Sequence, residues 1–562
     1  MKKSKVLQLF MLLVIISGTA FQHNENKQIN GDESLVITSQ KLDANNISTW
    51  FATNGMFNHN PVNPANAGFE WPKGSGKFAR FASGLWLGAR VGNDTLVAIT
   101  SYGSEYLNGY TDNNGVPQGE NNPVYRIYRL TYGINDQDRA NWPNALLGNS
   151  NQGAPVYFDN LTNSWKPLDF GHQTLFYRYT DSYPQSHTLQ NGSTAPLKAD
   201  VMKVDFSLNA PGGLDDVVFS QFTIINKSNN TWNDAFITIW TDDDLGYAAD
   251  DKVGCDSALN LGYTYNSTNN DPQYGNAPPA VGFLFLRGAL KFTGNNNDTV
   301  FICRNKTRIP LIGYKDLKMS GFNWFGNTND PQNGNPSNFR ESFRYMSGFR
   351  RNGQPIVHPL GYITKYMFSG DPVTNTGWNQ TGSGDDQRSI LSTGPVNMAP
   401  GDTQVIVIAQ PIARGTSNLN SITKLRELCA LVKNYYNSCY TAPAIGIEPI
   451  SNEVPGEFKL YQNYPNPFNP VTTIRFEIPL WRGVDADGGR GVLTKLIIYD
   501  ALGREVTTLV NEKLSPGAYE INWPACRSCG AGRDASDYPS GVYFYKLIAG
   551  DYSETKKMVL VK

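Results

Sequence analysis

Six aspartates gather in the stretch TDDDLGYAADDKVGCDS, which begins at Thr241 and directly follows the apolar run AFITIW. Carboxylates held this close repel one another, and a divalent cation with oxygen ligands relieves the repulsion. Ca²⁺ tolerates irregular loops better than Mg²⁺ does, so we predict a Ca²⁺ site in a loop at the end of a β-strand. The predicted ligands are Asp242, Asp244, Asp250, Asp251 and Asp256.

This acidic stretch differs from an EF-hand loop. Asp242, Asp244 and a turn at Gly246 match the opening of such a loop, but the closing glutamate is missing. The alternative is a solvated loop whose aspartates accept hydrogen bonds in turns. Carboxylates that converge on one another in a tight loop would favour the ion. An open cleft that brings Asp244 and Asp251 together with another acid or histidine and aromatic side chains would favour catalysis.

Other motifs give less support for catalysis. The segment PKGSGKF does not match a phosphate-binding loop, because Trp71 and Phe78 occupy positions that require glycine and serine or threonine. No histidine lies in a paired zinc-ligand spacing, and no G-x-S-x-G motif is present. Glu70 in GFEWP is the best single carboxylate for glycoside hydrolysis, and a role in a turn is the alternative. Trp324 and Trp378 lie in polar loops, where exposed indoles can stack on sugars.

The composition indicates an all-β protein with many turns. Of the 562 residues, 40% are hydrophobic, 12% aromatic and only 17% charged, with 53 glycines and 33 prolines. The net charge of −1 gives no general attraction for nucleic acid. The basic start MKKSK and the apolar run VLQLFMLLVII predict a signal peptide over residues 1–20, followed by a flexible segment over 21–40. No other apolar run is long enough to cross a bilayer, so we expect no transmembrane segment in the mature chain.

The main region, residues 41–440, reads as one large β-sandwich or as two with a break near Lys198. Alternating residues on both sides of Ser228-Asn229-Asn230 predict a hairpin. One helix is predicted near 420–438, capped by Asn420 or Ser421, with apolar residues at helical spacing. A proline-containing linker is predicted over 441–456.

Six cysteines permit disulfides in an exported chain, and two local pairs are candidates. Cys429 and Cys439 flank the predicted helix, and Cys526 and Cys529 form a C-x-x-C in a glycine-rich loop. A zinc ribbon would need a second C-x-x-C at a suitable distance, and the chain has none. The sequence does not choose among the possible connectivities.

Residues 457–562 contain a series of short alternating strands separated by Gly, Pro or Asn, which predicts an immunoglobulin-like β-sandwich. The segment YQNYPNPFNP precedes the first of these strands. Its prolines remove backbone donors, so this segment cannot form a central strand and is expected to be a stiff strap at the entry to the sandwich.

The motifs YQNYPNPFNPVTTIRFEIP, IIYDALGREVTTLVN, GAYEINW and SGVYFYKLIAGDYSETKKMVLVK occur in that order over residues 457–562. This tail resembles the type A C-terminal sorting domain of the type IX secretion system of the Bacteroidetes. Two loops, LWRGVDADGGRG and PACRSCGAGRDASDYP, are longer than in the common form. The resemblance implies a two-step export through the periplasm, with the secretion machinery as a partner. In that family the tail is commonly removed, and the cargo is released or attached to surface lipopolysaccharide.

The region before the tail resembles uncharacterised β-rich cargo regions, through GFEWPKGSGKFARFASGLWLGA and WTDDDLGYAADDKVGCDSALNLGYTYN. This resemblance implies no activity. We therefore expect a secreted or cell-surface protein that is non-enzymatic and serves in adhesion, binding or structure, with a glycan or surface polymer as its candidate partner. The alternative is an extracellular hydrolase acting on polysaccharide or protein.

Overall fold

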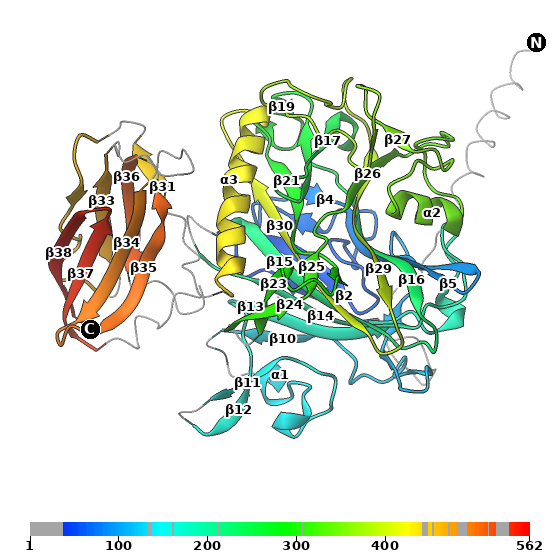
Figure 1. Ribbon diagram of the computed structural model, residues 1–562, viewed down its shortest axis with the longest axis horizontal. Coiled ribbons are helices and arrows are strands. Elements are labelled where there is room, and N and C mark those ends of the chain that lie inside the picture. The colour runs from blue at the N-terminus through cyan, green and yellow to red at the C-terminus, as the bar shows by residue number, and fades with distance from the viewer. Residues whose placement is uncertain are drawn as a thin grey trace, which may run out of the picture.

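The computed structural model describes residues 37–561 except 133, 135–136, 160–161, 211–213, 305–306, 441–447, 452–454, 470–471, 480–491, 515 and 524–538. The predicted signal peptide and the predicted Cys526–Cys529 pair lie outside the described residues. The described chain is mostly antiparallel β-structure with three α-helices, which confirms the all-β class (Figure 1).

A nine-stranded antiparallel sheet forms the larger layer of the main region. Eight strands follow the order β10-β13-β14-β15-β30-β21-β18-β17, and β7 pairs with β13. Strand β13 pairs directly with β14, so the sheet runs without interruption past Lys198, where a break was one of our two alternatives. The strands are β7 (Leu107–Asn108), β10 (Tyr128–Thr131), β13 (Gln173–Thr180), β14 (Ala199–Ser207), β15 (Val217–Asn226), β17 (Asp251–Asp256), β18 (Leu261–Asn266), β21 (Ala280–Arg287) and β30 (Thr403–Ala413).

A five-stranded antiparallel sheet forms the second layer, in the order β26-β29-β16-β5-β6. The prediction of a hairpin around Ser228-Asn229-Asn230 is wrong, because β15 and β16 flank this turn but belong to different sheets. The Asn226 side chain donates to the carbonyls of Asn230 and Met398, and these bonds fix the chain where it changes layer. The strands are β5 (Ala82–Val91), β6 (Asp94–Ala98), β16 (Trp232–Asp242), β26 (Gly321–Gly326) and β29 (Gln387–Met398).

Three buried clusters hold these layers together. The first takes apolar side chains from both sheets, for example Tyr177 of β13 and Ile239 of β16. The second lies between the nine-stranded sheet and helix α3 (Asn418–Asn437), which covers the outer face of that sheet (Figure 1). The third joins the outer face of the five-stranded sheet to helix α2 (Phe339–Met346). The main region therefore stacks as helix, sheet, sheet and helix.

Helix α3 confirms the helix predicted near 420–438. Its N-cap is Ser417, whose hydroxyl accepts from the Asn420 amide, so the prediction of Asn420 or Ser421 as the cap is wrong. The helical spacing is correct at Ile422, Leu425 and other positions that are buried against the sheet. The error arises because several polar residues precede the apolar stripe, and any of them can cap a helix.

Short elements decorate the two layers. A four-stranded sheet, β1-β2-β3-β4, packs against the first cluster, and a short helix and several two-stranded ribbons lie in the connections. These elements are β1 (Ser39–Leu42), β2 (Ser48–Ala52), β3 (Phe69–Glu70), β4 (Phe78–Arg80), β8 (Tyr110–Thr111), β9 (Pro117–Gln118), α1 (Gln137–Ala140), β11 (Val156–Asp159), β12 (Ser164–Pro167), β19 (Asn270–Asp271), β20 (Gly275–Asn276), β22 (Leu290–Phe292), β23 (Thr299–Arg304), β24 (Thr307–Ile312), β25 (Tyr314–Asp316), β27 (Ile356–Val357) and β28 (Ile363–Thr364).

A disulfide joins Cys303 of β23 to Cys439, just beyond the end of α3. The predicted Cys429–Cys439 pair is therefore wrong. Cys429 lies on the buried face of α3, where its free thiol packs against the nine-stranded sheet. Cys429 lies more than two turns before the end of α3, about 12 Å along the helix axis, which is farther than the roughly 5.5 Å between the Cα atoms of a disulfide. Strand β23 instead brings Cys303 to Cys439 from far along the chain.

The tail consists of two four-stranded sheets, β31-β36-β33-β32 and β35-β34-β37-β38. Their buried side chains form one cluster that includes Phe468, Trp523 and Tyr545. Within the predicted linker over 441–456, the structure has strand β31 (Glu448–Ser451), which pairs with β36 and adds to the tail. The remaining strands are β32 (Lys459–Leu460), β33 (Thr472–Ile478), β34 (Val492–Asp500), β35 (Glu505–Leu514), β36 (Gly517–Trp523), β37 (Gly541–Ala549) and β38 (Tyr552–Leu560).

Candidate metal centre

The acidic stretch begins where β16 ends. Asp242 is the last residue of β16, and its partner in the neighbouring strand β29 is Arg388. Because the two strands are antiparallel, the loop that follows β16 and the loop that precedes β29 lie at the same end of the sheet. Asp244 follows β16 and Asp386 directly precedes β29, so both reach the same place.

The structure brings Asp242 and Asp244 together with Asp386. Each offers one carboxylate oxygen, and these oxygens all lie within 4.8 Å of one another. Oxygen ligands that bind one Ca²⁺ at its usual bond lengths lie at most about 5 Å apart. The three side chains are therefore spaced as ligands of a single Ca²⁺.

Asp242 is the buried member of this group. Its Oδ2 accepts from the Tyr102 hydroxyl at 2.7 Å and from Arg388 Nη2 at 3.2 Å. Its Oδ1 is buried and has no hydrogen-bond donor among the described residues. Burial raises the pKa of Asp242 to about 8, with Arg388 opposing this effect. An orphaned buried carboxylate oxygen is costly unless a proton or a cation satisfies it.

Arg388 is the only cation with an ion pair to this group in the described part of the chain. Its Nη1 donates to Asp386 Oδ1 at 2.7 Å, and its Nε donates to the Tyr102 hydroxyl at 2.7 Å. Burial alone would lower the pKa of Arg388, but Asp242, Tyr102 and Asp386 raise it, so it stays charged. One arginine against three carboxylates leaves negative charge for a divalent cation to neutralise.

Asp244 and Asp386 form the more accessible side of the group. Burial, followed by the charge of Asp386, raises the pKa of Asp244 to about 6. The Asp386 side chain is 40% exposed, and its Oδ2 accepts from Asn327 Nδ2 at 3.0 Å. The group therefore has one side open to solvent, from which an ion can enter.

The other predicted ligands lie elsewhere in the hydrogen-bond network. Asp250 accepts from Asn266 Nδ2 at 2.6 Å. Asp251 is fully buried and accepts from the Leu245 amide at 2.9 Å, which fixes the loop. Asp256 caps a turn through the Leu259 amide, and its Oδ2 lies 3.5 Å from Arg426 Nε. The structure brings none of these three into the group around Asp242.

Asp243 has a structural role that the sequence analysis did not assign. Its two oxygens accept from the hydroxyls of Thr241 and Thr264, each at 2.7 Å, and Arg80 Nη1 lies 3.3 Å away. Arg80 is fully buried between the sheets, which lowers its pKa to about 10 despite the charge of Asp243. Successive residues after β16 therefore point to opposite sides, with Asp243 directed inward.

The aromatic and glutamate candidates are not part of this group. Glu70 accepts from the Gly76 amide at 2.8 Å, so it closes a turn. Trp324 and Trp378 are half-buried and pack against the first cluster. A hollow of about 690 Å³ is lined by Asn122, Arg126, Asn149 and neighbouring residues, far along the chain from the aspartates.

The third member of the group, Asp386, was missed by the sequence analysis. The available signal was the doublet Asp385-Asp386 directly before an alternating stretch, now β29. The sequence shows an acidic triplet after one strand and an acidic doublet before another. It does not show that these two strands are neighbours, so it does not predict that the two acidic segments meet.

The family comparison concerns the tail. Residues 462–562 match the model of the secretion system C-terminal sorting domain. The tail is a type IX secretion sorting domain. The sorting domain directs export, so the protein is secreted or lies at the cell surface, with the type IX machinery as its partner. Among the described residues, no helix combines the length and apolar character needed to cross a bilayer.

The other comparisons add no functional information. No curated protein matches the chain. The solved structures similar to it include three whose TM-scores are too low to carry an argument. They are "Polysaccharide Lyase BACCELL_00875" (TM-score 0.19, 6% identity, 64% of this chain and 34% of that chain), dimeric latent PorU from Porphyromonas gingivalis (0.14, 11%, 93% and 34%) and a Salmonella alpha-2-macroglobulin mutant (0.14, 10%, 85% and 26%). The chain spans about a third or less of the length of each.

Proposed function

We propose that this exported protein is a non-enzymatic adhesion or binding protein whose acidic site holds Ca²⁺. The observation that carries the proposal is Asp242 Oδ1, a buried acceptor without a donor, in a group whose oxygens lie within 4.8 Å of one another. Ca²⁺ satisfies this oxygen and offsets the excess negative charge. The ion then ties the loop after β16 to the loop before β29.

The geometry supports an ion site better than a hydrolytic site. The acid pair of a glycoside hydrolase flanks a substrate and is separated by roughly 5 to 9.5 Å. The oxygens of Asp242, Asp244 and Asp386 are closer than that, and Asp242 and Asp386 pair with the same arginine, Arg388. Neither of the two hollows, of about 690 and 610 Å³, is lined by these residues. These features favour a structural cation and a rigid loop edge.

Thermal unfolding of the full chain tests the ion. We expect the melting temperature to rise with Ca²⁺, to fall with a chelator, and to respond less to Mg²⁺. The variants D244N and D386N should abolish the response to Ca²⁺. The control D234N removes an exposed aspartate that pairs only loosely with Arg90, at 3.8 Å, and should keep the response. A melting temperature that is the same in saturating Ca²⁺ and in chelator would exclude the ion.

A further inference from the structure

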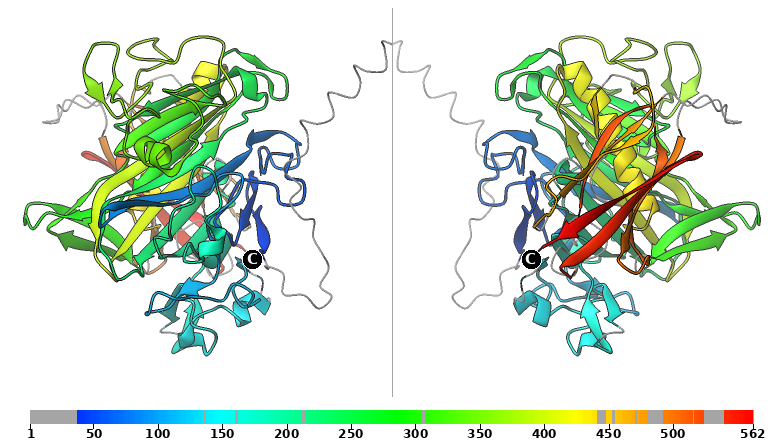
Figure 2. Two further views of the ribbon diagram at one scale, coloured as in Figure 1. Left: turned by 90° about the vertical axis from the view of Figure 1, so that its right-hand side faces the viewer. Right: turned by 90° about the vertical axis from the view of Figure 1, so that its left-hand side faces the viewer.

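An arm of two successive antiparallel ribbons leaves the main region between β21 and β26. Strands β22 and β25 form its base, and β23 and β24 form its outer part. Figure 2 shows this segment, coloured green, projecting from the body. The amides of Thr293 and Gly294 bond to the Gly313 carbonyl, and the Gly313 amide bonds to the Asp298 carbonyl, so the two ribbons form one continuous arm.

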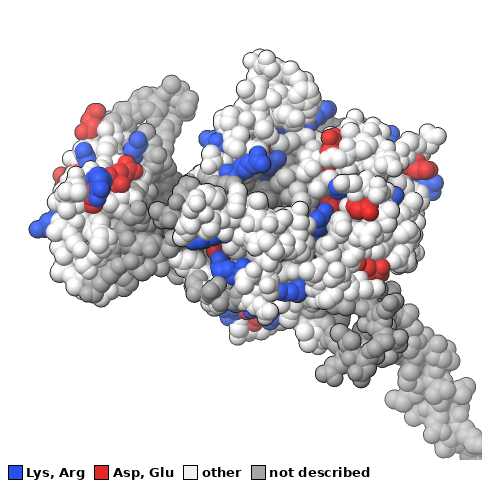
Figure 3. Space-filling model, turned by 90° about the horizontal axis from the view of Figure 1, so that it is seen from below, with Lys and Arg blue, Asp and Glu red and all other residues white. Residues whose placement is uncertain are grey.

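The arm is the basic part of a nearly neutral chain. Residues 287–318 contain seven lysines and arginines and only two aspartates, whereas the whole chain has a net charge of −1. Both aspartates serve local turns: Asp298 accepts from the Thr293 hydroxyl, and Asp316 accepts from the amides of Gly288 and Lys318. In the described part of the arm, neither Lys291, Arg308 nor Lys315 has an acidic side chain within salt-bridge distance. Figure 3 shows Lys and Arg spread over the lower face of the main region, with Asp and Glu among them.

Two lysines of the arm are paired in an unfavourable way. Lys291 and Lys315 lie directly opposite each other in the register of β22 and β25, and thus on one face of the ribbon. Like charges directly opposite in a sheet destabilise it. The next pair, Phe292 and Tyr314, packs on the other face with tilted rings whose centroids lie 5.1 Å apart. Because the neighbouring pair is aromatic and offers no anion, the repulsion between Lys291 and Lys315 is not compensated within the described part of the ribbon. An external anion would relieve it.

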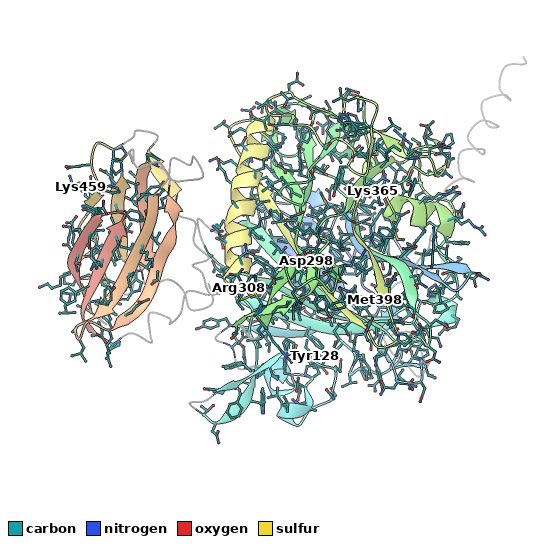
Figure 4. The ribbon with its side chains drawn as sticks, viewed as in Figure 1. Tyr128, Asp298, Arg308, Lys365, Met398 and Lys459 are labelled. Atoms are coloured by element: carbon teal, nitrogen blue, oxygen red, sulfur yellow. A yellow bond between two sulfur atoms is a disulfide. The ribbon has the colours of Figure 1, made fainter. Side chains whose placement is uncertain are left out.

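The outer part of the arm adds flat apolar surface next to a cation. The guanidinium of Arg308 lies 3.8 Å from the ring centroid of Phe301, on the same face of β23 and β24 (Figure 4 labels Arg308). Phe301 is 47% exposed, Ile312 is 61% exposed, and Phe292 at the base is 66% exposed. Exposed ring faces beside cations suit a chain of sugar rings that carries carboxylate or sulfate groups.

We propose that the arm binds an acidic polysaccharide. This inference rests on the adhesion or binding function proposed above and specifies its partner. The cations of the arm bind the anionic groups, and the exposed rings stack on the apolar faces of the sugars. The disulfide between Cys303 and Cys439 ties the arm to the end of α3, so the arm is held in place before the ligand binds.

The distribution of side chains argues against a membrane as the partner. A hairpin that enters a bilayer would carry its apolar residues at the tip. The last described pair at the outer end of the arm is Arg304 opposite Thr307, both polar, and the exposed apolar residues stand singly along the strands. An elongated polymer that runs along the arm fits this distribution better.

The test is binding of the full-length exported chain to immobilised polygalacturonate and heparin, with dextran as the neutral polymer. We expect binding to the two acidic polymers, no binding to dextran, and weaker binding as salt rises. The double variant K291A/K315A should bind about tenfold or more weakly. Its melting temperature should be equal to or higher than that of the wild type, because the variant removes the like-charge pair.

A matched control removes the same amount of charge elsewhere. The variant R340A/K365A changes two exposed cations near α2, and Lys365 is labelled in Figure 4 at a distance from the arm. This control should bind as the wild type does. Equal losses in both variants, or binding that K291A/K315A leaves unchanged, would overturn the proposal for the arm.

Other outcomes separate the arm from the broader function. Tighter binding to phosphatidylglycerol vesicles or to single-stranded DNA than to either acidic polymer would overturn the choice of a polysaccharide. If the protein binds dextran and K291A/K315A does not weaken that binding, the proposal for the arm is wrong, whereas the proposed binding function of the protein still holds. The Ca²⁺ melting experiment is independent of all these results, so a failure of the arm does not imply a failure of the ion site.

Discussion

Asp242 and Arg388 face each other across β16 and β29, with Arg388 Nη2 lying 3.2 Å from Asp242 Oδ2. The same arginine reaches Tyr102 and Asp386. One buried cation therefore holds together the two strand ends that form the candidate metal centre. The stability of this end of the five-stranded sheet should therefore depend on the charges of these side chains.

Replacing Arg388 by methionine should destabilise the protein strongly. At pH 9, above the raised pKa of Asp242, the variant R388M leaves the ionised Asp242 buried without its cation, and breaking a buried pair from one side costs about 3–5 kcal/mol. Urea unfolding measures the change. The double variant D242N/R388M should recover part of the loss, because it also removes the uncompensated carboxylate. An R388M variant as stable as the wild type would contradict this account of the pair.

Without Ca²⁺, the stability of the protein should fall as pH rises between about 4 and 8. The pKa of Asp242 is raised to about 8 and that of Asp244 to about 6, whereas an unfolded aspartate titrates near 4. In this window the folded state holds more protons than the unfolded state, so raising the pH favours unfolding. Melting temperatures at pH 5 and pH 8 in chelator measure the slope.

Saturating Ca²⁺ should flatten or reverse this slope, because the ion binds the deprotonated carboxylates. The variant D242N should show a smaller slope in chelator than the wild type. The control D234N should keep the wild-type slope. An identical slope in wild type and D242N would show that the pH dependence has another origin.

His187 should stabilise the protein more at low pH than at high pH. Its buried ring lies with Nε2 2.8 Å from the Asp181 carbonyl and 3.5 Å from Asp181 Oδ2, and with Nδ1 3.7 Å from Glu105 Oε2. Burial lowers the pKa of His187, but Asp181 and Glu105 outweigh this effect, and the pKa is raised above 6.5. A raised histidine pKa gives stability that is present below pH 6.5 and is lost as pH rises through the folded value.

The variant H187Q tests the contribution of the protonated imidazole, because glutamine can keep a hydrogen bond but cannot become positively charged. We expect H187Q to be less stable than the wild type at pH 6, with a difference that shrinks by pH 9. Chemical unfolding at the two pH values measures it. A difference that is constant with pH would assign His187 a packing role only.

Loss of the Cys303–Cys439 disulfide should lower stability by about 2–4 kcal/mol, because it closes a long loop with a sequence separation of 136. The variants C303S and C439S should show equal losses, and the double variant no further loss. A peptide map without reduction should contain the linked peptides. Cys255 and Cys429 should react with alkylating agents only after unfolding, because both are buried.

The sorting domain should require β31. This strand pairs with β36, through Glu448 opposite Glu520 and Pro449 opposite Tyr519. A fragment of residues 448–562 should melt at a higher temperature than a fragment of 457–562, whose β36 would be an unpaired edge. Fused to a foreign passenger, the longer fragment should give more export. Equal melting and equal export by the two fragments would show that β31 is dispensable.

Several elements could be predicted from the sequence because their signal is local. Alternation marks β16 and β30, helical spacing marks α3, and an acidic stretch after a strand marks the start of the candidate metal centre. The turn at Ser228-Asn229-Asn230 shows the limit of prediction from local patterns. Its flanking strands have the expected pattern, but they belong to two sheets, because alternation does not encode which partner a strand takes.

The all-β class and the sorting domain could be predicted from residue patterns alone, because these patterns are short and continuous. The folded chain was needed to show that Asp386 joins Asp242 and Asp244, that Cys303 pairs with Cys439, and that Lys291 lies opposite Lys315. These relationships depend on contacts between segments that are separated in the chain. Such contacts are fixed by the packing of the whole core rather than by the residues nearby.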